Sequence, residues 1–186
     1  MKSFVNTAKS YIFLAAVAGI IVTLDELTKY IVRTQLVLGE SWAPIPGLEN
    51  IIRIVHWNNT GAAFGLLPQG SLVFTFIAIA VAIAIIYYWP RVPADNIALR
   101  FALALQFGGA LGNLVDRLLN QGIVTDFVAV GRFPVFNIAD ASISVGVAIL
   151  IISTWWDERK KAKQADSEPM EEGEHEEPSP GVDPAG

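Results

Sequence analysis

The chain has 186 residues, of which 53% are hydrophobic and only 17% are charged, against about 25% charged residues in an average soluble domain. Its mean hydropathy of +0.46 and its long apolar runs exclude a disordered protein and argue against an ordinary soluble enzyme. The absence of cysteine excludes disulfides, thiol nucleophiles and cysteine-ligated metals. Two histidines leave little for a histidine metal site or a Ser-His-Asp triad.

The formal net charge of −5 hides an uneven distribution. Residues 164–186 carry eight acidic residues and no Lys or Arg, whereas the rest of the chain carries ten acids and 13 bases. The sequence therefore predicts a mildly basic membrane domain over residues 1–163, followed by an acidic tail. The tail is rich in proline and lacks apolar residues that could pack, so we expect it to be disordered and without a catalytic part.

Four segments are close to the length needed to cross a membrane, which is about 20 mostly apolar residues. We predict helices at about 10–33, 71–90, 96–117 and 137–157, which makes the fold class a membrane all-α protein. The first segment also contains an Ala16-Val17-Ala18 triplet typical of a signal-peptide cleavage site. The triplet lies inside the apolar core, and the helical pattern continues past it, which favours a membrane helix.

The Lys and Arg residues in the short loops predict the orientation. With both termini in the cytoplasm, eight basic residues are cytoplasmic and five are outside, and the cluster Arg159–Lys163 directly follows the last helix. Two outer segments, at about 36–69 and 120–134, then lie on the other face. Each holds a strand-like stretch, Asn50–Trp57 and Ile123–Val130, and together these predict a small sheet, or cradle, resting on the membrane surface.

Ionisable residues near a bilayer are costly unless they are paired or hydrated, and here they gather at the outer ends of the predicted helices. Asp25, Lys29 and Arg33 follow one another at four-residue spacing on the first helix. This spacing is typical of an ion pair at a helix end, and it also allows a functional site.

The third predicted helix carries two features. Ala104, Gly108 and Gly112 recur every four residues and favour close helix packing. On a neighbouring face, Asn113 and Arg117 can present an amide and a guanidinium to a polar group near the interface. Binding of lipid phosphates is an alternative role for this arginine.

Two carboxylates reach the same depth, Asp126 in the second outer segment and Asp140 in the first turn of the fourth helix. Asp126 has a simpler interpretation as a turn residue, and Asp140 as a carboxylate beside the N-cap Asn137. If the two groups lie within a few Å, both cannot ionise, so they share a proton and can activate a water between them. This is the chemistry of aspartic proteases, and it needs no thiol, histidine or metal.

Four sequence blocks carry a resemblance to a known family. They are Asp25–Lys29 (DELTK), Asn59–Gly65 (NTGAAFG), Gly108–Arg117 followed by Val124–Phe127, and Phe136–Asp140 (FNIAD). In these blocks, their order and their positions relative to four spans, residues 10–157 resemble the bacterial lipoprotein signal peptidase (signal peptidase II) family. Glu26 stands where that family often has Gln, and Ala141-Ser142 replaces a more usual Ser directly after the aspartate.

The resemblance implies a membrane aspartic endopeptidase that removes signal peptides from prolipoproteins, on the N-terminal side of a cysteine carrying diacylglyceryl. It implies a catalytic dyad of Asp126 and Asp140, with no cofactor and no metal. Residues 36–69 look like the family's cradle and lid over the substrate. The positions that would bind substrate or support the site are Asp25, Lys29, Asn59, Gly61, Asn113, Arg117 and Asn137.

The resemblance further implies a multi-pass protein of the bacterial plasma (inner) membrane, with its active site near the outer face. The expected partners are diacylglyceryl prolipoproteins and membrane lipids, without nucleic acid, and the expected state is a monomer. A small proton-coupled transporter is the alternative, but its ionisable residues would lie near helix centres or in an inverted repeat. A structural scaffold would leave both aspartates unexplained.

Overall fold

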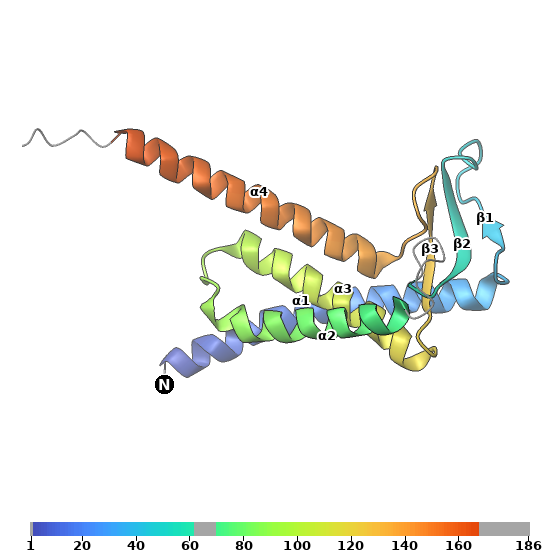
Figure 1. Ribbon diagram of the computed structural model, residues 1–186, viewed down its shortest axis with the longest axis horizontal. Coiled ribbons are helices and arrows are strands. Elements are labelled where there is room, and N and C mark those ends of the chain that lie inside the picture. The colour runs from blue at the N-terminus through green and yellow to red at the C-terminus, as the bar shows by residue number, and fades with distance from the viewer. Residues whose placement is uncertain (1, 62–69, 168–186) are drawn as a thin grey trace, which may run out of the picture. The chain divides into compact units, whose positions relative to one another are not determined.

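The computed structural model describes residues 2–61 and 70–167. Its helices are α1 (Lys2–Gln35), α2 (Gly70–Tyr88), α3 (Ile97–Leu119) and α4 (Ile138–Ser167), with a 3-10 turn, η2 (Trp89–Arg91), after α2 (Figure 1). Its strands are β1 (Ser41–Trp42), β2 (Ile52–Asn59) and β3 (Val124–Val130). Within this part of the chain, four stretches are long and apolar enough to span a membrane: Ser10–Gln35, Gly70–Arg91, Ile97–Leu119 and Ile138–Lys160. The predicted fold class is therefore confirmed.

Two helices are longer than their apolar segments predict. α1 begins at Lys2 instead of about residue 10, and α4 continues past residue 157 to Ser167. The prediction counted apolar residues, whereas Ala, Lys, Arg and Glu have good helix propensity and prolong a helix beyond the hydrocarbon. Residues 164–167 of the expected tail are thus helical. Residues 168–186 of the tail and residues 62–69 of the expected lid lie outside the described residues.

The chain divides into two compact units, Met1–Ser153 and Thr154–Gly186. The first unit contains α1, α2, α3, the strands and the first half of α4. In the second unit, the guanidinium of Arg159 lies 4.0 Å from the centre of the Trp155 ring. Such a cation–π contact is typical of basic and aromatic residues near a membrane interface.

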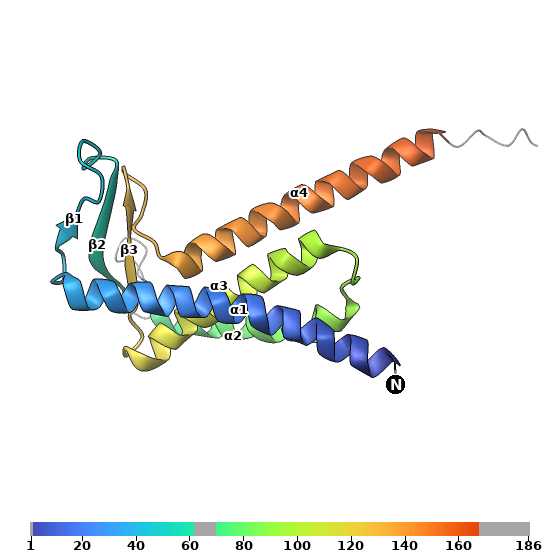
Figure 2. The same ribbon diagram turned by 180° about the vertical axis from the view of Figure 1, so that it is seen from behind.

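Within the first unit, α3 packs against both α1 and α2 (Figures 1 and 2). A Cβ atom added to Gly108 would lie 2.9 Å from Ile21 Cβ and 3.0 Å from Ala18 Cα of α1. The added Cβ at Gly146 of α4 would lie 2.7 Å from the carbonyl oxygen of Ala102 of α3. The small residues therefore allow the close helix approach that their spacing predicts.

The three strands form one antiparallel sheet in the order β1-β2-β3, at the end of the helices where α1 ends and α4 begins (Figure 1). In the β2–β3 register, Ile52 pairs with Val130 and Asn59 with Val124, with an irregularity between Ile54 and Trp57. The predicted pairing of the two strand-like stretches is confirmed. The two-residue strand β1 was not predicted. The sheet places Asn59 and Asp126 next to the C-terminal ends of α1 and α3 and the N-terminal end of α4.

Candidate active site

Asp140 is fixed by the way α4 begins. The side-chain Oδ1 of Asn137 accepts a hydrogen bond from the backbone N–H of Asp140 at 2.9 Å, and Asp140 Oδ2 accepts from the backbone N–H of Asn137 at 3.4 Å. This reciprocal pair is the capping-box arrangement, which satisfies two donors at the start of a helix. Another free donor, the N–H of Ala139, is bound by Asp25 Oδ1 at 2.9 Å. The first turn of α4 is thereby held against α1.

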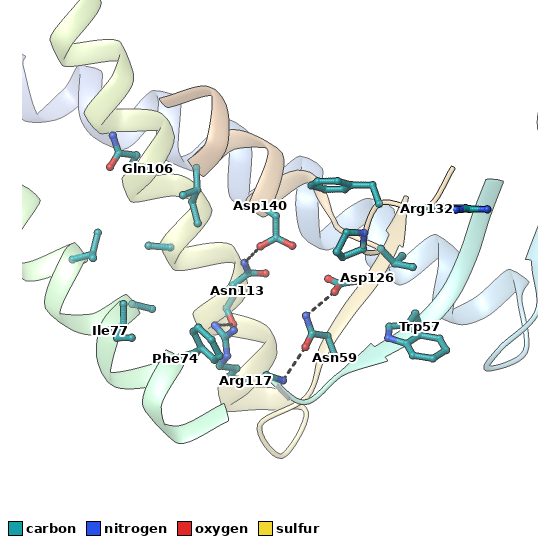
Figure 3. A pocket seen from close by; sticks show the side chains of 18 residues that line it. Trp57, Asn59, Phe74, Ile77, Gln106, Asn113, Arg117, Asp126, Arg132 and Asp140 are labelled. Atoms are coloured by element: carbon teal, nitrogen blue, oxygen red, sulfur yellow. Dashed lines mark hydrogen bonds between the residues drawn. The ribbon is translucent and has the colours of Figure 1, made fainter. Parts of the chain in front are cut away.

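Asp126 lies on β3 and is 1% exposed. Its Oδ2 accepts a hydrogen bond from Asn59 Nδ2 at 2.8 Å, and its Oδ1 accepts one from Asn137 Nδ2 at 2.7 Å. Asn137 therefore contacts both aspartates, and Figure 3 shows the two carboxyl groups facing the same space. Residues 126 and 140 are brought together as a pair.

Asn113 of α3 joins this pair to the helices. Its Nδ2 donates to Asp140 Oδ1 at 2.7 Å (Figure 3), and its Oδ1 accepts from Asn137 Nδ2 at 3.0 Å and from Lys29 Nζ at 3.3 Å. Both ends of the Asn113 amide are thus committed. The hydrogen bonds from Asn113 and Asn137 therefore fix the orientation of the carboxyl groups of Asp140 and Asp126.

The pKa of Asp126 is raised from its ordinary value of 3.8 to about 7. Burial is the largest cause because it disfavours the charged form, and the negative charge of Asp140 adds to it. The hydrogen bonds from Asn59 and Asn137 and the charge of Lys29 act in the opposite direction. Asp126 can therefore hold a proton near neutral pH.

The two aspartates line a cavity of about 890 Å³. Near them it is polar, with Asn59, Asn113 and Arg117, whereas its walls on α2 and α4 are mainly apolar. The apolar lining residues on these helices and on α3 are Phe74, Ile77, Ala78, Val81, Ala110 and Ile143. Apolar walls with a few polar groups at one place are typical of a ligand-binding or active site. Among the described residues, no three His, Asp or Glu side chains are placed to hold a metal ion.

A buried cluster of ion pairs, formed by Lys29, Asp25 and Asp116, lies next to the pair Asp126 and Asp140. Lys29 is fully buried, and its Nζ lies 2.6 Å from Asp25 Oδ2 and 3.0 Å from Asp116 Oδ2. Asp116 also accepts hydrogen bonds from the backbone N–H of Thr125 at 2.9 Å and from Arg33 at 2.9 Å. The cluster therefore ties α1 to α3 and to the start of β3, one residue before Asp126.

Arg117 and Gly61 shape the side of the cavity toward β2. Arg117 donates a 3.3 Å hydrogen bond to the carbonyl oxygen of Asn113, and its guanidinium carbon lies 5.8 Å from the centre of the Phe74 ring. Gly61 has φ +76°, and a Cβ there would lie 2.8 Å from Phe74 Cδ2. Its N–H donates to Asn59 Oδ1 at 2.8 Å. This bond turns the Nδ2 of Asn59 toward Asp126.

All seven residues expected to support the site surround the two aspartates or their buried neighbours. Sequence reasoning left Asp116 and Thr125 out of the site, and it gave Arg33 only as the end of the charged stripe on the first helix. Asp116 follows Asn113 by three residues and so lies on the same side of α3. This spacing is the sequence signal that could have indicated Asp116 as part of the site. Its pairing with Lys29 depends on how α1 and α3 pack, which spacing within one helix cannot give.

Comparison with known proteins adds independent information. Residues 17–156 match the family model described as signal peptidase (SPase) II. The lipoprotein signal peptidase of Shouchella clausii (strain KSM-K16) is 41% identical over 138 residues, which cover 74% of this chain and 89% of that protein. That of Bacillus subtilis (strain 168) is 40% identical over 152 residues, covering 80% and 96%. A solved bacterial membrane enzyme, determined by the in meso method at 2.3 Å, aligns with a TM-score of 0.72 and 36% identity, over 80% of this chain and 91% of that one.

Proposed function

The chain belongs to the signal peptidase II family, and we propose that it uses Asp126 and Asp140 to cut signal peptides from diacylglyceryl-modified prolipoproteins. It is a multi-pass membrane protease, and the comparisons support signal-peptide removal from prolipoproteins and not the transporter alternative. The observation that carries the proposed dyad is the placement of both carboxyl groups on one cavity, with Asn137 bonded to each.

In the proposed mechanism, Asp126 is the protonated member because its pKa is raised to about 7, and Asp140 acts as the base. Asp140 removes a proton from a water held between the two groups, and the resulting oxygen attacks the carbonyl carbon of the cleaved bond. Asp126 donates a hydrogen bond to the carbonyl oxygen as it gains charge. The intermediate collapses when Asp140 returns the proton to the leaving nitrogen.

The amides and cations around the dyad position these groups. Asn113 and Asn137 hold Asp140 and Asp126 in the orientations needed to share one water. Arg117 lines the cavity, and its guanidinium is placed to bind a carbonyl oxygen of the substrate. The buried cluster around Lys29 keeps the ends of α1 and α3 and the start of β3 in register.

The proposed location follows from the basic residues in the loops and near the ends of the spans. We place both termini in the cytoplasm and the sheet on the outer face, because the basic residues are more numerous on the side of the termini. A lipid-modified cysteine is held at the outer interface by its acyl chains. The bond before it is then presented at the depth of the aspartates, so the lipid acts as an anchor that aligns substrate and dyad.

We expect the enzyme to discriminate strongly for the lipid. Two peptides with the same signal sequence, one with and one without diacylglyceryl on the cysteine, should differ at least about 100-fold in kcat/KM. The acyl chains hold the cysteine at the interface and align the bond before it with the dyad, and alignment of reacting groups supplies a factor of at least this size. Cleavage is followed by mass spectrometry in detergent micelles that take up both peptides. Equal kcat/KM for the two would contradict a lipid-anchored substrate.

Activity should also depend on the proton of Asp126. kcat/KM is expected to fall as the pH rises through about 7, because Asp126 then loses the proton it donates. The free energy of unfolding should fall over a lower range, as the pH rises from about 3.8 to about 7, because over that range the folded state holds a proton that the unfolded state has lost. A pH–rate profile and thermal unfolding in detergent check both. A rate that keeps rising well above neutral pH would exclude Asp126 as the acid.

A further inference from the structure

Gln106 is a polar residue that lines the cavity. It lies on α3 seven residues before Asn113, which places it about 10 Å farther along the helix axis. In Figure 3 it stands on α3 well away from the two aspartates, and it lines the same cavity. Its Nε2 is buried and has no hydrogen-bond partner among the residues that the structure describes.

The surroundings make this free amide unusual. The apolar walls of the cavity that it lines include Ile77, Ala78 and Val81 on α2, Ala110 on its own helix and Ile143 on α4. A buried N–H without a partner costs free energy, and buried polar groups in folded proteins are almost always hydrogen-bonded. The position is also inside the span Ile97–Leu119, where bulk water is absent. The N–H of Gln106 is thus available to an acceptor that enters the cavity.

The proposed substrate brings such acceptors. A signal peptide crosses the membrane as a helix, in which each carbonyl oxygen accepts a hydrogen bond from within the helix. For the water held by the dyad to reach the cleaved bond, the residues before that bond must leave the helix. Their carbonyl oxygens then lose their partners in a region without water. Irregular backbone at this depth is tolerated only where it is buried in protein or lines a water-filled cavity. Because the walls of this cavity on α2 and α4 are mainly apolar, the protein has to replace those hydrogen bonds.

The depth of Gln106 selects one of these carbonyls. An extended peptide advances about 3.3 Å per residue, so the distance of about 10 Å from Asn113 corresponds to about three residues. We propose that Gln106 donates its free N–H to a backbone carbonyl about three residues before the cleaved bond, and so holds the end of the substrate helix unwound. This inference rests on the proposed function, since it takes the cleaved bond to lie beside Asp126 and Asp140.

The test combines one variant with a set of modified substrates. Gln106→Met keeps the size of the side chain and removes the donor. The substrates are diacylglyceryl peptides in which a single backbone amide is replaced by an ester, which weakens the preceding carbonyl as an acceptor. The ester is moved along the five residues before the cleaved bond. Leu105→Met, at a neighbouring residue that does not line the cavity, serves as the control variant.

We expect Gln106→Met to lower kcat/KM on the unmodified substrate about tenfold, with an unchanged or higher melting temperature, because an unpaired buried donor is removed. In the wild type, an ester that weakens the carbonyl about three residues before the bond should cost a similar factor. The same ester should cost Gln106→Met nothing, whereas Leu105→Met should behave like the wild type.

The inference is overturned if no ester position lowers kcat/KM in the wild type. It is also overturned if kcat/KM of Gln106→Met depends on ester position in the same way as that of the wild type. In either case Gln106 is bound to water or to the protein. A substrate whose acyl chains are ether-linked provides a further arm. If the effect of Gln106→Met disappears on that substrate, the acceptor is an ester carbonyl of the lipid, and the inference is again overturned. Cleavage of the unmodified substrate by the wild type tests the proposed function separately.

Discussion

Asp126→Asn is expected to lower the cleavage rate of a diacylglyceryl prolipoprotein by about a thousandfold or more. Asparagine keeps the shape of the side chain but has no ionisable proton to share with Asp140. A positioned acid or base contributes about 10² to 10⁴ in rate, and here the same proton also controls the charge of the pair. The measurement is single-turnover cleavage by purified enzyme in detergent micelles.

Asp140→Asn should have an effect of the same size, and the double variant should lose little more, because residues that act as one unit are not additive. Asp95→Asn is the matched control, since Asp95 is an exposed aspartate before α3. Elution volume and melting temperature show that each variant is folded. Cleavage within tenfold of the wild type by either dyad variant would remove that residue from the mechanism.

Lys29→Met is expected to destabilise the fold by about 3–5 kcal/mol, the usual result of removing one partner from a buried ion pair. Lys29 and Asp25 are fully buried, and Asp116 is 1% exposed. Without the lysine, Asp25 and Asp116 keep negative charges inside the protein with fewer partners. The measurement is reversible unfolding in mixed micelles, with wild type and variant compared at the same detergent composition.

Arg33→Met provides the control. Arg33 also pairs with Asp116, at 2.9 Å, but its side chain is 29% exposed, so water screens the pair and we expect a loss of about 1 kcal/mol or less. Adding Asp25→Asn to Lys29→Met should recover part of the stability, since it neutralises one of the two stranded carboxylates. A Lys29→Met variant as stable as the wild type would contradict a structural role for the cluster.

The sequence predicts the spans well because each depends on local composition. The uncharged run before Trp89 is sufficient by itself to predict α2 (Gly70–Tyr88). The strands β2 and β3 follow from their Ile- and Val-rich stretches. The far ends of α1 and α4 were missed because charged residues of high helix propensity continue a helix where hydropathy no longer indicates one.

The site was predictable in part. The capping interaction between Asn137 and Asp140 is local, so a three-residue spacing was enough to suggest it. The common depth of Asp126 and Asp140 suggested that they could share a proton. Their assignment as the catalytic pair came from the family resemblance, since the residues between them do not determine where β3 lies. Asp116 has partners on α1 and β3. The free Nε2 of Gln106 depends on the shape of a cavity that three helices, two strands and a loop line. A local sequence pattern predicts neither of these two features.

The most direct test of the dyad is a structure of Asp126→Asn with an uncleaved diacylglyceryl prolipoprotein peptide bound. The proposed mechanism predicts that the carbonyl carbon of the bond before the lipidated cysteine lies within about 4 Å of a water bound to Asp140, with its oxygen directed toward residue 126. A cleavable bond seated elsewhere, with both side chains turned away from it, would contradict the mechanism.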